Sequence, residues 1–159
     1  MSINSRLIVL GLALATLLAV PSHPVFSSAS LQIDPKAVSV VLPENIPWQR
    51  GASADTAQLQ GDPSKPGIYV QLIRWHRGNM SQPHSHSTAR YIYVVSGTWW
   101  VGTGSKYQPE KTVPVRAGSY VVDQPNELHY DGAKDEECVL YLVGMGPMTT
   151  TQANSGAVR

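Results

Sequence analysis

The sequence predicts an all-β protein, and three observations support this fold class. Short runs rich in valine, isoleucine, tyrosine and tryptophan are separated by clusters of glycine, proline and asparagine, a spacing typical of a β-sandwich or β-barrel. No apolar repeat of helical period follows residue 30. The 12 prolines also oppose helices, because proline lacks a backbone N–H and clashes with the preceding helical turn.

Seven runs have the length of a strand. In chain order they are residues 38–42, 68–75, 91–95, 98–103, 113–115, 119–123 and 138–143. The segment Val95-Ser96-Gly97-Thr98 predicts a tight turn between two of them, because glycine adopts a positive φ without steric cost. The only cysteine, Cys138, begins the last run. It is expected to be a buried apolar residue, and a single cysteine forms no internal disulfide.

The N-terminus has the pattern of a secretory signal peptide. Arg6 is followed by an apolar run of 14 residues at 7–20, which is short for a membrane-spanning helix, and then by the small residues Ser27 and Ala29. We expect cleavage after Ala29 and a secreted or periplasmic protein; an uncleaved membrane anchor is the alternative. Removing residues 1–29 takes Arg6 from the 12 basic residues and none from the 11 acidic ones, leaving 11 of each. This balance indicates no nucleic-acid partner and, once the signal is removed, no membrane partner.

Histidines carry the chemistry that the sequence predicts. His84 and His86 lie two residues apart, so on an extended chain both imidazoles project to the same side. A third ligand must come from elsewhere, and His129 follows a different strand and turn. Three protein ligands that leave positions open are typical of a catalytic metal site rather than a structural one. A His-x-His pair alone is a weak signal.

The residues around these histidines resemble the two motifs of the cupin superfamily. The first motif has a glycine, then five residues, then His-x-His, and further on a glutamate, six residues and a second glycine. Gly78, His84, His86 and Gly97 match its glycines and histidines at these positions. The second motif is matched by Gly118 and His129; Gln124 and Pro125 stand at its proline, Asn126 at its glycine and Ala133 at its final asparagine. Asn126 is a reasonable substitute for glycine because asparagine tolerates left-handed backbone.

This resemblance implies a double-stranded β-helix, or jelly-roll barrel, with a metal in its mouth. The expected organisation is a signal peptide at 1–29, an N-terminal arm and loop at 30–66, a cupin barrel at 67–147 and a disordered tail at 148–159. The expected cofactor is a divalent transition metal, namely Fe, Mn, Ni, Zn or Cu, held by His84, His86 and His129. The superfamily performs many reactions, so the fold does not specify one.

Arg90 stands where the cupin motif has its glutamate, usually the fourth ligand. A guanidinium has no lone pair for a metal, so the site resembles cupins that hold iron through three histidines. Facing the barrel, Arg90 would bind an anionic substrate with two hydrogen bonds. The alternative is that Arg90 pairs with a carboxylate from Glu127, Asp131 or Asp123.

Two function classes follow from the sequence. The first is a metal-dependent enzyme, dioxygenase-like or related, that acts on a small and anionic organic molecule. The second is a non-catalytic cupin that binds or senses a small ligand through a structural metal. A sizeable apolar pocket beside the metal would favour the enzyme, and a filled barrel would favour the binding protein. Tyr91 and Tyr93 lie on the strand face opposite Arg90, where either could pack between the sheets or across a homodimer.

Overall fold

The computed structural model describes residues 33–153, which divide into a unit ending at Val40 and a larger unit from Val41 onward. The expected signal peptide at 1–29 lies outside the described residues. In the first unit the amides of Ala37 and Val38 donate to the carbonyl of Asp34 and form a turn. Within residues 33–153 no helix is long and apolar enough to cross a membrane.

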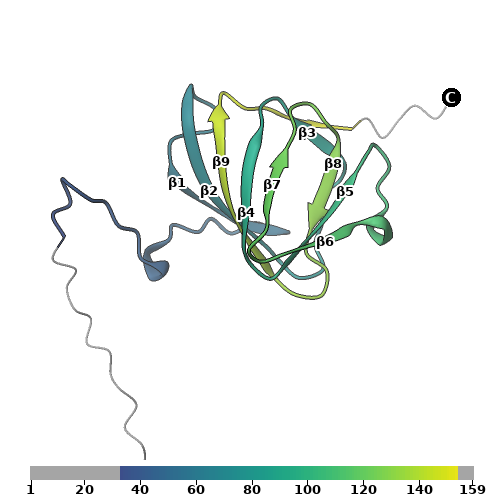
Figure 1. The fold of residues 1–159 in the computed structure, drawn as a ribbon, viewed down its shortest axis with the longest axis horizontal. Coiled ribbons are helices and arrows are strands. Elements are labelled where there is room, and N and C mark those ends of the chain that lie inside the picture. The colour runs from purple at the N-terminus through teal and green to yellow at the C-terminus, as the bar shows by residue number, and fades with distance from the viewer. Residues whose placement is uncertain (1–32, 154–159) are drawn as a thin grey trace, which may run out of the picture. The chain divides into compact units, whose positions relative to one another are not determined.

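The larger unit is built from antiparallel strands and two 3-10 turns (Figure 1). The turns are η1 (Pro43–Asn45) and η2 (Pro109–Lys111), and the strands are β1 (Ala54–Gln60), β2 (Gly67–Trp75), β3 (His84–His86), β4 (Arg90–Ser96), β5 (Thr98–Thr103), β6 (Val113–Arg116), β7 (Tyr120–Asp123), β8 (His129–Gly132), β9 (Cys138–Gly146) and β10 (Thr150–Gln152).

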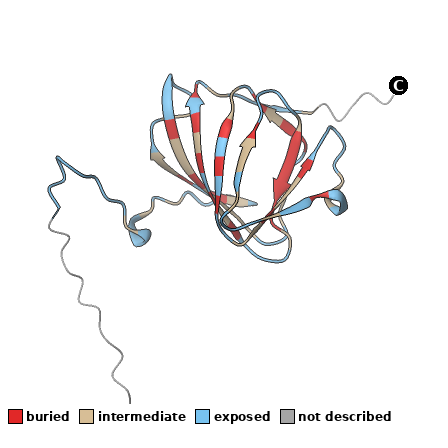
Figure 2. Cartoon of the chain, viewed as in Figure 1, coloured by how far each residue is buried: buried red, intermediate tan, exposed pale blue. Residues whose placement is uncertain are grey.

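The strands form two five-stranded sheets, which together make the expected double-stranded β-helix. The first sheet has the order β1-β2-β9-β4-β7 and the second has the order β10-β3-β8-β5-β6. Burial alternates along β4 and β9, because successive side chains of a strand point to opposite faces (Figure 2). The inward residues form one core cluster, which includes Ile92, Trp99, Leu140 and Leu142. Cys138 belongs to this cluster, as expected, and burial raises the pKa of its thiol to about 12.

Two backbone positions confirm the conformations that the motifs predict. Gly97 has a φ of 71° between β4 and β5, and a Cβ there would lie 2.2 Å from the carbonyl oxygen of Glu137. Asn126 is the one non-glycine residue with positive φ in the described chain, at 63°. It therefore takes the left-handed conformation for which the motif has glycine.

The structure differs from the sequence-based prediction at three places. Residues 38–42 have strand composition but form no strand, since nothing in the described chain pairs with them. The expected arm at 30–66 contains β1, which pairs along β2. The expected disordered tail from residue 148 contains β10 in its described part, and Thr150–Gln152 pair with β3. Polar strands such as β10 carry no apolar alternation, so only their pairing partners reveal them.

Candidate metal centre

The three histidines lie on adjacent strands of the second sheet. His84 and His86 lie at the two ends of β3, and His129 begins β8 directly opposite His84. The loop that precedes β8 contacts the same segment, because the amide of Asn126 donates to the carbonyl of His86 over 2.7 Å. The left-handed turn at Asn126 thus fixes the point at which His129 enters the sheet.

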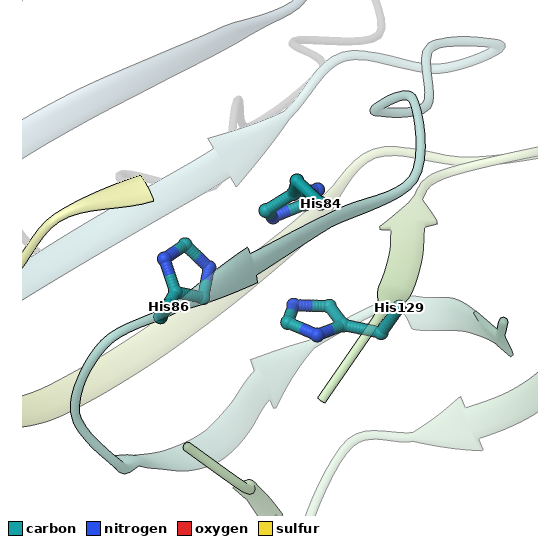
Figure 3. Close-up of side chains that lie close together, drawn as sticks. All are labelled: His84, His86 and His129. Carbon is teal, nitrogen blue, oxygen red and sulfur yellow. The ribbon is translucent and has the colours of Figure 1, made fainter. Parts of the chain in front are cut away.

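All three rings are buried and close together (Figure 3). Ring centroids are 4.6 Å apart for His84 and His129, 4.8 Å for His84 and His86, and 5.3 Å for His86 and His129. One ring nitrogen from each residue lies within 4.8 Å of the others. In Figure 3 a nitrogen of each ring points into the space between the three. The structure therefore brings the predicted ligands together.

Hydrogen bonds set the orientation of each ring. Nδ1 of His84 bonds the carbonyl of Gln82 at 2.8 Å, and Nδ1 of His129 bonds the carbonyl of Glu127 at 3.1 Å. Nδ1 of His86 bonds the hydroxyl of Thr150 at 3.0 Å. A carbonyl can only accept, so Nδ1 carries a proton in His84 and His129, and in the neutral imidazole Nε2 then has the lone pair. This is how metal-binding histidines are held in proteins.

The opposite ring nitrogens fit a metal. Nε2 of His86 and Nε2 of His129 are buried and have no hydrogen-bond partner within residues 33–153, an arrangement that is costly unless something binds there. Burial lowers the pKa of His84, and burial together with the Arg90 charge lowers the pKa of His86 to about 2. Neutral imidazoles are the form that coordinates a cation. The donor set thus fits a divalent transition metal.

A cavity of about 250 Å³ opens beside the histidines. Its polar end includes His84, His86 and Arg90. Four more polar residues also line it: Ser81, Asp131, Thr150 and Gln152. The apolar part of its wall belongs to the core: Ile73, Trp75, Ile92, Trp99, Leu140 and Leu142. The barrel is therefore not filled, and the cavity gives a small organic molecule room beside His84 and His86.

Arg90 faces this cavity and also pairs with a carboxylate. Asp123 lies opposite Arg90 in the register of β4 and β7. Nε and Nη2 of Arg90 donate to the same oxygen, Oδ2 of Asp123, at 3.0 and 2.5 Å. Of the three carboxylates considered from the sequence, Asp123 is the partner. Nη1 makes no hydrogen bond to the described residues and remains for a ligand.

Two residues contact the histidines in ways that the sequence did not predict. Asp131 is buried on β8, its Oδ2 lies 3.8 Å from Nε2 of His129, and burial raises the pKa of its carboxyl group. No motif marks it, although its place two residues after His129 puts both side chains on one face. Thr150 lies in a run of threonines that resembles a tail, so the sequence offers no signal for its contact with His86.

Comparisons with known proteins place this geometry in a family. A family model described as the ChrR cupin-like domain matches residues 36–149. No curated protein matches the sequence. The fold is similar to the polyketide cyclase RemF from Streptomyces resistomycificus, with a TM-score of 0.62, 14% identity, and coverage of 75% of this chain and 87% of that one.

Two further solved structures share the fold. KdgF from Halomonas sp. has a TM-score of 0.54 and 18% identity, covering 68% of this chain and 95% of that one. An RmlC-like cupin from Shewanella frigidimarina has a TM-score of 0.53 and 16% identity, covering 65% of this chain and 86% of that one. At these identities the likeness concerns the fold. With the family match over most of its length, the chain belongs to the ChrR cupin-like family of the cupin superfamily.

Proposed function

We propose that this protein is an exported metal-dependent cupin enzyme that acts on a small, anionic organic molecule. His84, His86 and His129 hold a divalent transition metal, and the substrate occupies the cavity beside it. When bound, the metal supplies Lewis-acid or redox chemistry at its open positions. Cupin folds similar to this one include a polyketide cyclase, a DMSP lyase and a sugar phosphate isomerase, which supports small organic substrates as a class.

One observation carries the proposal. The three buried imidazoles lie close together, and two of them, those of His84 and His86, line a cavity that also has an apolar wall. A structural metal site is closed by protein ligands, whereas here the described residues offer three ligands and an open cavity. This supports an enzyme over a protein that only binds a ligand.

The charges around the cavity support an anionic substrate. A divalent metal on three neutral imidazoles brings two positive charges into a buried place. The Arg90–Asp123 pair is itself neutral, and the Asp131 carboxyl group, if ionised, offsets one of the two charges. A ligand carboxylate or enolate would offset the metal charge and accept a hydrogen bond from the free Nη1 of Arg90. The apolar wall would take the carbon skeleton.

Metal analysis of protein purified from its native compartment tests the metal. We expect about one transition-metal ion per chain, together with oxygen uptake or substrate loss with one member of a panel of small carboxylic acids. Protein that binds metal and a carboxylate without turnover would instead be the non-catalytic binding cupin. Protein that holds no metal above background after exposure to Fe, Mn, Ni, Zn and Cu would end the proposal.

Arg90→Lys tests the anion contact. The substitution keeps the charge and loses the planar guanidinium, so affinity for the carboxylate identified in the panel should fall about tenfold to a hundredfold, as expected for losing a charge-assisted hydrogen bond. Metal stoichiometry should not change. Equal affinity in Arg90→Lys and wild type, measured by calorimetry, would leave Arg90 as the partner of Asp123 only.

Export is the remaining part of the proposal. It is supported by the apolar run at 7–20 and the small residues at Ser27 and Ala29. Native protein should begin near Ser30 and be found outside the cytoplasm. An intact Met1 in mass spectrometry of the native protein would contradict cleavage.

A further inference from the structure

The strand β10 contacts the metal-binding segment along its whole length. It pairs with β3 in the register Thr150↔His86 and Gln152↔His84. Flanking bonds extend the pairing: the amide of Ser87 donates to the carbonyl of Thr149, and the amide of Ala153 donates to the carbonyl of Pro83. The strand is short and exposed, and it forms the edge of its sheet.

Thr150 connects this strand to the chemistry of the site. Its hydroxyl is 3.0 Å from Nδ1 of His86 and donates to the sulfur of Met148 at 3.7 Å. With the hydroxyl proton directed to sulfur, the oxygen accepts from Nδ1–H. The His86 tautomer is then the one with a lone pair on Nε2, the buried nitrogen without a partner.

We propose that Thr150 is a positioning residue for the metal, and that docking of β10 and metal binding stabilise each other. This inference rests on the proposed metal site. Without the Thr150 hydroxyl the His86 ring loses its only hydrogen bond among the described residues and is free to turn or change tautomer. Because coupling between two sites is reciprocal, the metal must in turn hold the strand that orients its ligand.

Zinc affinity, measured by competition with a chromogenic chelator, tests the role of the hydroxyl. Loss of an outer hydrogen bond to a ligand histidine lowers metal affinity by about 10- to 100-fold, and we expect this for Thr150→Val. Thr150→Ser keeps the hydroxyl and should bind zinc nearly as well as the wild type. Thr151→Val is the matched control, since the neighbouring side chain points to the other face and is exposed.

Hydrogen exchange tests the coupling. Zinc should slow exchange of the Ser87 and Ala153 amides, which hold β10 to its neighbours, in the wild type and less in Thr150→Val. Equal zinc affinity in Thr150→Val and wild type, or an equal loss in Thr151→Val, would overturn the inference. A wild type that binds no zinc or other transition metal would overturn the metal centre itself. Thermal unfolding without metal shows whether each variant is folded.

A second, independent observation concerns the outer face of the first sheet. Its exposed apolar side chains lie in register: Tyr93 faces Tyr141 on one side and Tyr120 on the other, and Ile68 faces Met145. Tyr120 is 66% exposed, and Tyr91 and Tyr93 are each 48% exposed. Among the described strands β9, β4 and β7, no outward-facing position carries a charged side chain.

We infer that this face binds a second copy of the chain. A large side chain has a surface of about 200 Å². With their exposed fractions, the six apolar residues of this face together expose roughly 600 Å². A standard interface buries roughly 800 Å² on each partner, which is close to this area. These residues are Ile68, Tyr91, Tyr93, Tyr120, Tyr141 and Met145. The part of this face on β9, β4 and β7 carries no charged side chain, and the outward Arg74 of β2 is paired with Asp55. Two copies can therefore meet over these three strands without burying an unpaired ion.

Sedimentation at micromolar concentration tests the second inference. The wild type should be a dimer, and Tyr93→Glu, at the centre of the face, should be a monomer with an unchanged circular dichroism spectrum. Val113→Glu is the control, because Val113 is an exposed apolar residue of the other sheet. Tyr120→Glu repeats the test at the edge strand in case Tyr93→Glu fails to fold. A monomeric wild type, or a Tyr93→Glu dimer as stable as the wild type, would overturn it.

Discussion

The two sheets of the barrel contribute differently to the protein. The first sheet has the long strands β2 and β9, and its inner face supplies apolar core residues such as Leu140 and Leu142. The second sheet has short strands and carries all three histidines of the site. Every residue of β8 is buried, although His129 and Asp131 carry an imidazole and a carboxyl group. One sheet thus provides most of the apolar burial, while the other holds polar groups in a buried place. Stability and metal binding should therefore respond to different substitutions.

The largest expected effect is on metal binding. His86→Ala in the second sheet removes one of three ligands and should abolish most bound metal, a loss greater than the roughly 100-fold that outer-sphere changes cause. His76→Ala is the matched control, because His76 bonds Asp55 and lies outside the site. Metal content after dialysis is the measurement. Full stoichiometry in His86→Ala would show that the second sheet does not hold the metal.

The Arg90–Asp123 pair is a buried ion pair between β4 and β7 of the first sheet. Arg90→Gln should lower the free energy of unfolding by about 3–5 kcal/mol, because Asp123 is left buried without its charged partner. Adding Asp123→Asn should recover much of that loss. Chemical denaturation of the two single variants and the double variant gives the coupling energy. Additive losses would mean that the pair does not act as a unit.

The apolar part of the first sheet should affect stability without affecting the metal. Leu142→Ala removes a fully buried side chain from the core and should cost about 2–5 kcal/mol. Metal stoichiometry of the folded fraction should stay at the wild-type value. If Leu142→Ala releases metal while the protein is still folded, then the two sheets are coupled more closely than their composition suggests.

The smallest effect concerns Asp55, on the outer side of the first sheet. Burial opposes its ionisation, but hydrogen bonds from His76 and Gly51 hold the pKa of the carboxyl group below its usual value of 3.8. A carboxyl group with a lowered folded-state pKa stabilises the fold above its unfolded pKa, and this contribution is lost as pH falls through the folded pKa. Asp55→Asn should therefore be less stable than wild type at pH 6. The difference should shrink below pH 3.8, and a constant difference from pH 6 to pH 2.5 would exclude this cause.

The first sheet was more predictable from sequence than the second. Strands such as β2 and β9 are rich in β-branched and apolar residues, so their composition identifies them. The strands β8 and β10 are polar and short, and β1 contains alanine and glutamine; each is stabilised by its neighbours in the sheet. Residues 38–42 show the converse, because strand composition without a pairing partner forms no strand.

For the site, motif spacing identified the three histidines, and residue type alone left the partner of Arg90 open. Only the register of β4 with β7 selects Asp123 over Glu127 and Asp131. The hydroxyl that orients His86 comes from a segment that looks like a tail, since the sequence does not encode which distant strand it meets.

The pairing of His84 with His129 also sets the order of events when the chain folds. These residues lie far apart in sequence, and they meet only once β3 and β8 have joined in one sheet. Long-range strand pairing is a slow part of folding. A metal ion cannot nucleate this barrel in the way that it nucleates a zinc finger, whose ligands are close in sequence. We therefore expect the proposed metal to bind after β3 and β8 have paired, and refolding to proceed at the same rate whether or not metal is in solution.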